Sequence, residues 1–405
     1  MKHRIIQFYT ICFLALGLIS CKSGQAQKKG TLESSTVSEN IVNHSILLGA
    51  DNYDLYLPLL KNKKVGIVTN QTGILSNGTH LVDFLISKNT HLTTIFAPEH
   101  GFRGTADAGE DIVDGKDTKT SLPIISLYGT NKKPKPEQIQ QVEIMIFDIQ
   151  DVGARFYTYI STLHYIMESC AENNIQLIVL DRPNPNISII DGPVLEKEYT
   201  SFVGMHPIPL LHAMTIGEYA QMINGEKWLK GGIQCDLKII PCHNYDRKML
   251  YSLPVKPSPN LPNDKAINLY ASLCLFEGTN VSVGRGTDMQ FQIYGSPYLP
   301  KTNFSFTPNP NIGAKDPLHK GKECFGENLS DLPFVDKLEI KWLIKAYNST
   351  TDKSKFFNDF FVKLAGTKKL REQIEKGVSE TEIRKSWRKG LNEFKEMRKK
   401  YLIYN

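Results

Sequence analysis

The sequence lacks the short motifs that mark several large enzyme classes. It contains no C-x-x-C pair, no H-E-x-x-H, no G-x-S-x-G and no G-K-[ST]. Nothing in it therefore indicates a zinc protease, a serine hydrolase of the nucleophile-elbow type or a phosphate-binding loop. No metal or other cofactor is predicted, although a metal site built from Glu99, His100 and nearby aspartates is an alternative.

Cysteine is scarce, and the charge is nearly balanced. Only seven of 405 residues are cysteine, and two of these lie within the first 21 residues. The other five are an odd number and are scattered, which predicts no disulfide framework but allows one bridge. A net charge of +6 is too small to indicate a nucleic-acid partner. With 41% hydrophobic residues, the composition is that of a globular protein.

The N-terminus is predicted to be a targeting segment. Lys2 and Arg4 precede an apolar run that ends in "LISC" at Cys21, and this run is short for a membrane span. The pattern resembles a bacterial lipobox, which predicts a signal peptide over residues 1–21 and lipidation of Cys21. An ordinary cleaved signal is the alternative. Either interpretation predicts export, and the lipobox predicts a membrane anchor that faces the periplasm, followed by a flexible tether over residues 22–45.

From residue 64 onward, β-branched apolar runs alternate with segments of helical periodicity. "KVGIVTN", "HLTTIFAP", "LPIISLYG", "EIMIFDIQD" and "IQLIVL" are typical of buried strands, and "THLVDFLISKN" and "YISTLHYIMESCAENN" are typical of amphipathic helices. This alternation predicts an α/β fold with a doubly wound parallel sheet. The proline-rich segment 253–266 favours a boundary between a catalytic domain at 46–258 and a smaller α/β domain at 259–405.

Polar residues follow several of the predicted strands. They are expected to share one edge of the sheet, because the carboxyl ends of parallel strands meet there and commonly bind ligands. Glu99 and His100 follow the second strand, between Pro98 and Gly101, on a short and stiff loop. Such a carboxyl group suits a general acid that His100 assists. The alternative is a structural ion pair between Glu99 and Arg103.

The segment "FDIQDVGARFYTYISTL" at 147–163 combines carboxylates, an arginine and aromatic rings. Carbohydrate sites use these groups for proton transfer, for binding substrate carboxylates and for stacking on sugar rings. Asp148 or Asp151 is a candidate base or nucleophile, unless both only flank a helix N-terminus. The residues predicted to bind substrate are Asn70, Gln71, Arg103, Arg155, Tyr157, Asp181, Arg182, Asn184, Glu277, Asn280 and Arg285.

Five motifs in the same order resemble the NamZ-type exo-β-N-acetylmuramidases of peptidoglycan recycling. They are "VGIVTNQTG", "APEHGFRG", "FDIQDVGARFYTYISTL", "DRPNP" and "FEGTNVSVGRGTD", and the resemblance extends from about residue 46 to the C-terminus. It implies a Rossmann-like catalytic domain, a smaller C-terminal domain and a cleft between them. Gln290 and Tyr298 stand where the family more often has proline and tryptophan, which bears on substrate preference.

The resemblance also implies an activity and a partner. Such enzymes release N-acetylmuramic acid from the non-reducing ends of muramoglycans, and Glu99 looks like the family's proposed catalytic glutamate. Hydrolysis then proceeds by retention, by inversion or with help from the substrate's acetamido group. Arg155 or Arg285 is the candidate for binding the lactyl carboxylate. A non-catalytic sugar-binding lipoprotein and a metal-dependent cell-wall hydrolase are the alternative functions.

Overall fold

The computed structural model of the chain describes residues 45–103 and 114–405, which belong to one compact unit. The predicted signal peptide, Cys21 and nearly all of the predicted tether lie outside these residues. No helix in the part that is described has the length and apolar character needed to cross a membrane.

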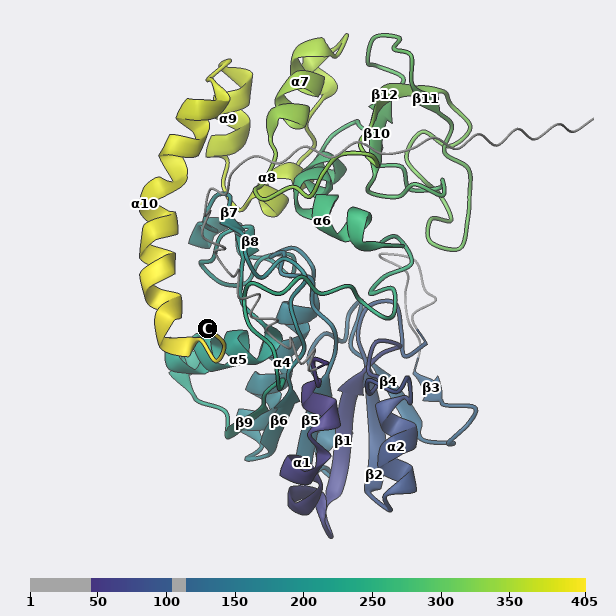
Figure 1. The fold of residues 1–405 in the computed structure, drawn as a ribbon, viewed down its shortest axis with the longest axis vertical. Coiled ribbons are helices and arrows are strands. Elements are labelled where there is room, and N and C mark those ends of the chain that lie inside the picture. Colours follow the sequence, from purple (N-terminus) through teal and green to yellow (C-terminus); the bar gives the residue numbers. More distant parts are fainter. Residues whose placement is uncertain (1–44, 104–113) are drawn as a thin grey trace, which may run out of the picture. The chain divides into compact units, whose positions relative to one another are not determined.

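A seven-stranded sheet forms the centre of the fold, in the order β3-β4-β2-β1-β5-β6-β9 (Figure 1). Neighbouring strands are parallel, except that β3 runs antiparallel to β4 at one edge. The strands are β1 (Lys64–Thr69), β2 (His91–Ala97), β3 (Gly115–Lys116), β4 (Pro123–Ser126), β5 (Ile144–Asp148), β6 (Gln176–Leu180) and β9 (Leu237–Ile240). The predicted α/β fold with a mostly parallel sheet is therefore confirmed.

Helices cover both faces of this sheet because the buried strands carry apolar side chains on both sides. On β6, Ile178 and Leu180 pack into the same cluster as α1 (Tyr53–Leu60) and α2 (Leu81–Ser87). Leu177 and Val179 point the other way, into the cluster that contains residues of α4 (Tyr159–Glu172) and α5 (Ile216–Gly225). Figure 1 shows the two helix pairs on opposite faces. Short elements in the connections include α3 (Pro136–Ile139), β7 (Ile190–Asp191) and β8 (Leu211–His212).

The C-terminal part combines helices with a small antiparallel sheet, ordered β10-β12-β11. Its strands are β10 (Ile293–Ser296), β11 (Ser305–Phe306) and β12 (Cys324–Asn328), and its helices are α6 (Asp264–Leu273), the 3-10 helix η4 (Cys274–Gly278), α7 (Lys341–Ser349), α8 (Phe360–Ala365), α9 (Lys369–Glu375) and α10 (Glu380–Arg398). One apolar cluster contains both Leu177 and Trp387, so the core continues across residue 258. The domain boundary at that residue stays a prediction.

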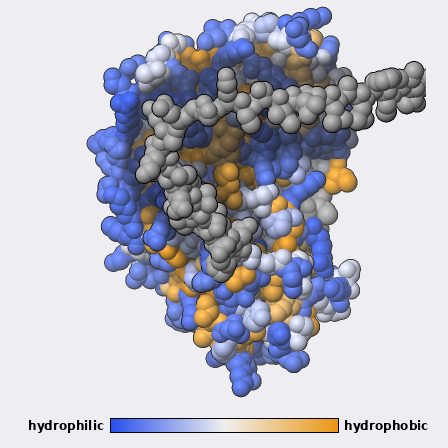
Figure 2. Space-filling model, in the orientation of Figure 1, coloured by the Kyte–Doolittle hydropathy of each residue, from blue (hydrophilic) through white to orange (hydrophobic). Residues whose placement is uncertain are grey.

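The helix α10 is amphipathic, as its sequence predicts. Ile383, Trp387 and Phe394 are buried in the core, and charged side chains cover the opposite face. Figure 2 shows that the edge of the molecule formed by α10 is hydrophilic. In the segment 355–366, α8 begins only at Phe360, and the buried side chains of Phe356 and Phe357 precede it.

The five cysteines of the described part are all free and buried. They are Cys170, Cys235, Cys242, Cys274 and Cys324. The single bridge that the sequence allowed does not form between any of them.

Candidate active site

A tight turn at the carboxyl end of β2 presents Glu99 and His100. Gly101 donates its backbone N–H to the carbonyl of Pro98 at 3.0 Å, which closes the turn. His100 and Gly101 have φ angles of +69° and +76°. A positive φ at a non-glycine residue is uncommon and costs energy, and such positions cluster at functional sites. The turn therefore holds two titratable side chains in one fixed orientation.

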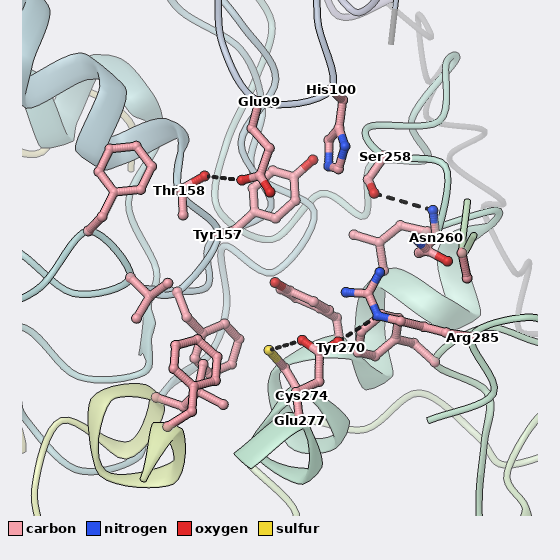
Figure 3. A pocket seen from close by; sticks show the side chains of 18 of the residues that line it. Glu99, His100, Tyr157, Thr158, Ser258, Asn260, Tyr270, Cys274, Glu277 and Arg285 are labelled. Carbon is pink, nitrogen blue, oxygen red and sulfur yellow. Dashed lines mark hydrogen bonds and ion pairs between the residues drawn. The ribbon is translucent and has the colours of Figure 1, made fainter. Parts of the chain in front are cut away.

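Glu99 reaches into a cavity of about 420 Å³, a volume within the range of small-molecule sites. Its Oε2 accepts a hydrogen bond of 2.7 Å from Oγ1 of Thr158, the residue before α4. In Figure 3 the carboxyl group lies beside the ring of Tyr157, with His100 across from it. Arg103 pairs with Asp117, so the predicted alternative of a Glu99–Arg103 bridge is not what the structure shows.

The wall of the cavity is largely aromatic, which suits the apolar faces of sugar rings. Tyr157 packs edge-to-face against Tyr159 and Tyr270, with ring centroids 4.8 and 5.8 Å apart. The hydroxyl of Tyr157 donates to the carbonyl of Pro257 at 2.7 Å, and Asn70 donates to the hydroxyl of Tyr159 at 2.9 Å. The aromatic residues that line the cavity are Tyr128, Phe156, Tyr157, Tyr159, Phe202, Tyr270, Phe291 and Phe360.

An arginine and a glutamate lie on another side of the cavity. Arg285 Nε donates to Glu277 Oε1 at 2.5 Å, and Glu277 belongs to η4. Burial lowers the pKa of Arg285, but the Glu277 carboxylate outweighs this effect and leaves that pKa above its usual value. The glycine-containing motif around Arg285 resembles a phosphate-binding loop only superficially. It presents the cationic side chain of Arg285 to the cavity. Ser258, Asn260 and Asp316 complete its polar lining.

Five of the predicted site residues line this cavity: Glu99, His100, Tyr157, Glu277 and Arg285. The other predicted residues are near it or buried beneath it. Asn70 supports Tyr159, Gln71 donates to the carbonyl of Lys256 at 3.0 Å, and the carbonyl of Asn280 accepts from His319 at 2.7 Å.

Asp148 and Arg182 form a buried ion pair, and neither lines the cavity. Their predicted roles in catalysis and substrate binding stay predictions. Arg182 donates to the two oxygens of Asp148 at 2.6 and 2.9 Å, and both side chains are almost fully buried. A third bond joins Arg182 to the carbonyl of Ile74 at 2.8 Å. With its oxygens occupied, Asp148 is a structural partner that fastens the end of β5 to the end of β6.

Asp151 is also buried and does not line the cavity. Its Oδ2 accepts from the backbone N–H of Gly153 at 2.7 Å and lies 3.8 Å from Nε2 of His212. Burial raises the pKa of Asp151 to about 7 and lowers the pKa of His212 to about 3. The Oδ1 atom of Asp151 is buried and has no hydrogen-bond partner among residues 45–103 and 114–405. The predicted role of Asp151 as base or nucleophile stays a prediction.

Arg155 is buried and does not line the cavity. Its terminal nitrogens donate to four backbone carbonyls at 2.7 to 3.0 Å, those of Pro193, Ile208, Leu364 and Ala365. Asp181 and Asn184 are likewise buried: Asp181 accepts from Thr215, Gly217 and Tyr404, and Asn184 donates to Met214. The predicted contacts of these three residues with substrate stay predictions.

Several cavity residues were not predicted. Thr158 belongs to the quoted segment 147–163, but a threonine before a helix is easily taken for a simple cap. Ser258 and Asn260 lie in the proline-rich segment that was interpreted only as a boundary. Phe202 and Phe360 belong to stretches without a polar motif. Among residues 45–103 and 114–405, no group of three or more potential ligand side chains is arranged to hold a metal ion.

A carboxyl group at a strand end, an aromatic cavity and a facing arginine together define a glycoside hydrolase type of site on an α/β fold. The comparisons with known proteins agree with this class. The chain belongs to the exo-β-N-acetylmuramidase NamZ family: residues 65–265 match the model of the N-terminal part and residues 268–404 match that of the C-terminal part. The resemblance found in the sequence is therefore confirmed.

Three relatives illustrate this membership. The peptidoglycan β-N-acetylmuramidase NamZ of Bacillus subtilis (strain 168) is 41% identical over 374 residues, which is 86% of this chain and 89% of that protein. Two solved structures are DUF1343 family proteins from Bacteroides fragilis NCTC 9343, and both comparisons cover 89% of this chain and 99% of the other. Their identities are 45% and 29%, with TM-scores of 0.83 and 0.76.

The two departures from the family pattern lie outside the cavity lining. Gln290 is buried, and Tyr298 is an exposed residue whose ring lies 5.8 Å from that of His319. Neither residue lines the cavity itself, although Gln290 directly precedes Phe291, which does.

Proposed function

We propose that this protein hydrolyses the β-glycosidic bond of a terminal, non-reducing N-acetylmuramic acid in peptidoglycan fragments. Glu99 acts as the general acid. The observation that carries the proposal is the position of the Glu99 carboxyl group in the aromatic cavity of a NamZ family member. The activity named for the relative from Bacillus subtilis supports the same substrate class.

Glu99 donates its proton to the bridging oxygen as the bond from that oxygen to C1 breaks. The hydrogen bond from Thr158 orients the carboxyl group in the cavity for this transfer. Aromatic neighbours exclude water from the surroundings of the carboxyl group, which strengthens electrostatic interactions with the developing positive charge on the sugar.

The acetamido group of the substrate serves as the nucleophile in this proposal. Asp148 and Asp151 are buried outside the cavity, and the two oxygens of Glu277 are occupied by Arg285 at 2.5 Å and by the Cys274 thiol at 3.4 Å. Asp316 lies at the solvent-exposed edge of the lining, where its side chain is 89% exposed and pairs with Lys320 at 3.6 Å. The acetamido oxygen bonds to C1 while the leaving group departs with the proton from Glu99. Water then attacks C1 and gives its proton to the Glu99 carboxylate, and the bond from C1 to the acetamido oxygen breaks, which restores the acetamido group. This sequence retains the β configuration, which proton NMR of the first product detects.

The test is incubation with a disaccharide in which N-acetylmuramic acid is β-linked to N-acetylglucosamine. Release of free N-acetylmuramic acid is expected, together with much slower cleavage of chains that end in N-acetylglucosamine. Glu99→Gln should lower kcat by roughly 10³-fold, within the range for removing a general acid. Glu143→Gln is the matched control, because Glu143 is an exposed partner of Lys63.

Failure of the well-folded protein to release the sugar would overturn the proposal. Retained affinity for muramoglycans without turnover would instead indicate the non-catalytic sugar-binding function. Loss of turnover on treatment with a chelator, with recovery on adding metal, would indicate the metal-dependent hydrolase.

We also propose that the chain is exported and anchored to a membrane by lipid on Cys21, facing the periplasm. The sequence pattern that ends in "LISC" supports this proposal. In bacteria that express the full chain, the protein should partition with membranes, and Cys21→Ala should release it or block its processing. Equal membrane association of both forms would contradict the anchor.

A further inference from the structure

Arg285 has an edge of its guanidinium group that the fold leaves facing the cavity. Only Nε is used by Glu277, and the terminal nitrogens make no hydrogen bond to residues 45–103 or 114–405. Figure 3 shows these nitrogens pointing toward the centre of the cavity, on the side where Glu99 and His100 lie. Two parallel N–H groups of this kind match the two oxygens of a carboxylate.

The other buried arginines of the fold differ from Arg285 in this respect. The terminal nitrogens of Arg155 are saturated by four carbonyls, and Arg182 is bonded to Asp148 and Ile74. Arg285, in contrast, lines the cavity and keeps about a fifth of its side chain exposed, at 22%. It is therefore positioned to bind a ligand and not only to stabilise the chain.

The backbone around Arg285 holds it in place before any ligand arrives. Gly284 and Gly286 flank it with φ angles of +78° and +79°, which residues that carry a side chain rarely adopt. A Cβ atom at Gly284 would also lie 2.6 Å from Ile293, and one at Gly286 would lie 2.6 Å from the carbonyl of Asn309. The guanidinium carbon lies 5.1 Å from the ring centre of Phe291. A preset orientation of this kind reduces the entropy lost on binding.

We infer that Arg285 is the specificity-determining residue that binds a carboxylate substituent on the terminal sugar. This inference rests on the proposed function. In N-acetylmuramic acid the substituent is the lactyl ether on O3, which N-acetylglucosamine lacks. Glu277 holds the guanidinium plane through Nε and directs the two terminal nitrogens toward the lactyl carboxylate. The substrate class of the cavity is therefore an acidic amino sugar.

The first experiment changes the ligand and leaves the protein intact. Binding of free N-acetylmuramic acid, its methyl ester and N-acetylglucosamine is measured by calorimetry with the unmodified enzyme. The acid should bind roughly 30-fold more tightly than the ester, because the ester removes a charged partner of two hydrogen bonds. Equal binding of acid and ester would overturn the inference, whatever the catalytic activity.

The second experiment changes Arg285. In Arg285→Gln the preference for the acid over the ester should fall to about one, and Arg285→Lys should keep only part of it, since lysine binds as a point charge. On aryl β-glycosides, kcat/KM should fall by roughly 30-fold or more for the muramoside and remain near the wild-type value for the glucosaminide. Equal losses on both glycosides would overturn the inference.

Arg371 offers a matched control. It donates from Nε to Glu375 Oε1 at 2.8 Å, and its guanidinium carbon lies 5.4 Å from the ring centre of Phe357. It thus repeats the local contacts of Arg285 on α9, outside the cavity lining. Arg371→Gln and Arg371→Lys should leave both the binding preference and the kinetics unchanged.

These measurements separate the inference from the proposed function. If the enzyme hydrolyses muramosides but binds acid and ester equally, the inference fails and the proposed function stands. If it prefers the acid through Arg285 but releases no sugar, the carboxylate subsite stands and the proposed hydrolysis fails.

Discussion

Thr158 Oγ1 donates a hydrogen bond to Glu99 Oε2 at 2.7 Å, and the two residues are 59 positions apart in the chain. The contact joins the turn after β2 to the residue that precedes α4 (Figure 3). It fixes the rotation of the carboxyl group at the lining of the cavity.

Removing the Thr158 hydroxyl should therefore impair turnover more than folding. Thr158→Val keeps the shape of the side chain and deletes a hydrogen bond to an ionisable group, worth roughly 1.5–3 kcal/mol. A fall in kcat of roughly 10- to 100-fold is expected, with KM little changed. Thr158→Ser, which keeps a hydroxyl, should restore most of the rate. Wild-type kinetics in Thr158→Val would contradict this role.

Because Asp148 and Arg182 form a buried ion pair, replacing either residue should lower the stability of the fold and not the rate of catalysis by the folded protein. Asp148→Asn leaves the guanidinium of Arg182 buried without its counter-charge, which should lower the free energy of unfolding by about 3–5 kcal/mol. Removing both charges, in Asp148→Asn with Arg182→Gln, should cost less than the sum of the single changes. Denaturant unfolding measures both effects. Normal stability with lost turnover in Asp148→Asn would restore the catalytic role predicted from sequence.

Asp151 should make stability depend on pH in a recognisable direction. Burial raises its pKa in the folded state to about 7, above the ordinary value of 3.8. Between these values the folded carboxyl group binds a proton that the unfolded one has released, so this group's contribution to stability falls as the pH rises. Asp151→Asn has no such group, and its stability relative to wild type should rise from about pH 4 to about pH 7 and then level off.

His212 makes the stability of the fold depend on pH in the opposite direction. Burial lowers its pKa to about 3, so the unfolded state binds the extra proton between that value and 6.5, and stability rises with pH in this window. Because His212 remains in Asp151→Asn, the difference between the two proteins reports on Asp151. A difference that is constant with pH would show that the folded carboxyl group titrates normally.

Arg155 provides a test of whether a second arginine determines specificity. Replacement by methionine leaves four carbonyls without their donor, and each unsatisfied buried group costs about 1–3 kcal/mol. Thermal unfolding should show severe destabilisation. In the fraction that folds, the preference for muramosides over glucosaminides should be unchanged. A lost preference would mean that Arg155 acts on the substrate after all.

The fold was predictable wherever burial leaves a simple pattern in the sequence. β1, β2, β5 and β6 are short apolar runs that are largely buried, β4 is a shorter and only partly buried run, and α2 and α4 carry apolar residues at helical spacing. The edge strands β3 and β9 were not predicted. β3 has only two residues, and the burial of β9 alternates incompletely, so neither produces a strong apolar run.

The site was only partly predictable, because the sequence shows which residues are polar at strand ends but not which partners they find. Glu99 lies just after β2 and Asp148 is the last residue of β5, with β1 between these strands, and the two residues look alike in sequence. In the structure Glu99 opens into the cavity, while Asp148 is closed off by Arg182, which lies 34 positions further along the chain. Likewise, Arg155 and Arg285 are both arginines near aromatic residues. Two of the four carbonyls that bind Arg155 belong to α8, about 210 positions away, and no pattern in the sequence near Arg155 predicts these contacts.

The burial of Arg155 by segments from both halves of the chain also affects how the protein folds during synthesis. The guanidinium of Arg155 is buried by two acceptors in the 193–208 region and two at the end of α8, so its desolvation is compensated only when both are present. In a nascent chain whose α8 has not yet been synthesised, the Arg155 guanidinium in the interior of the N-terminal half lacks two of its four hydrogen bonds. Expression of the N-terminal half alone should therefore yield aggregation-prone material, and natural fusions or permutations of this architecture should keep the two halves on one polypeptide.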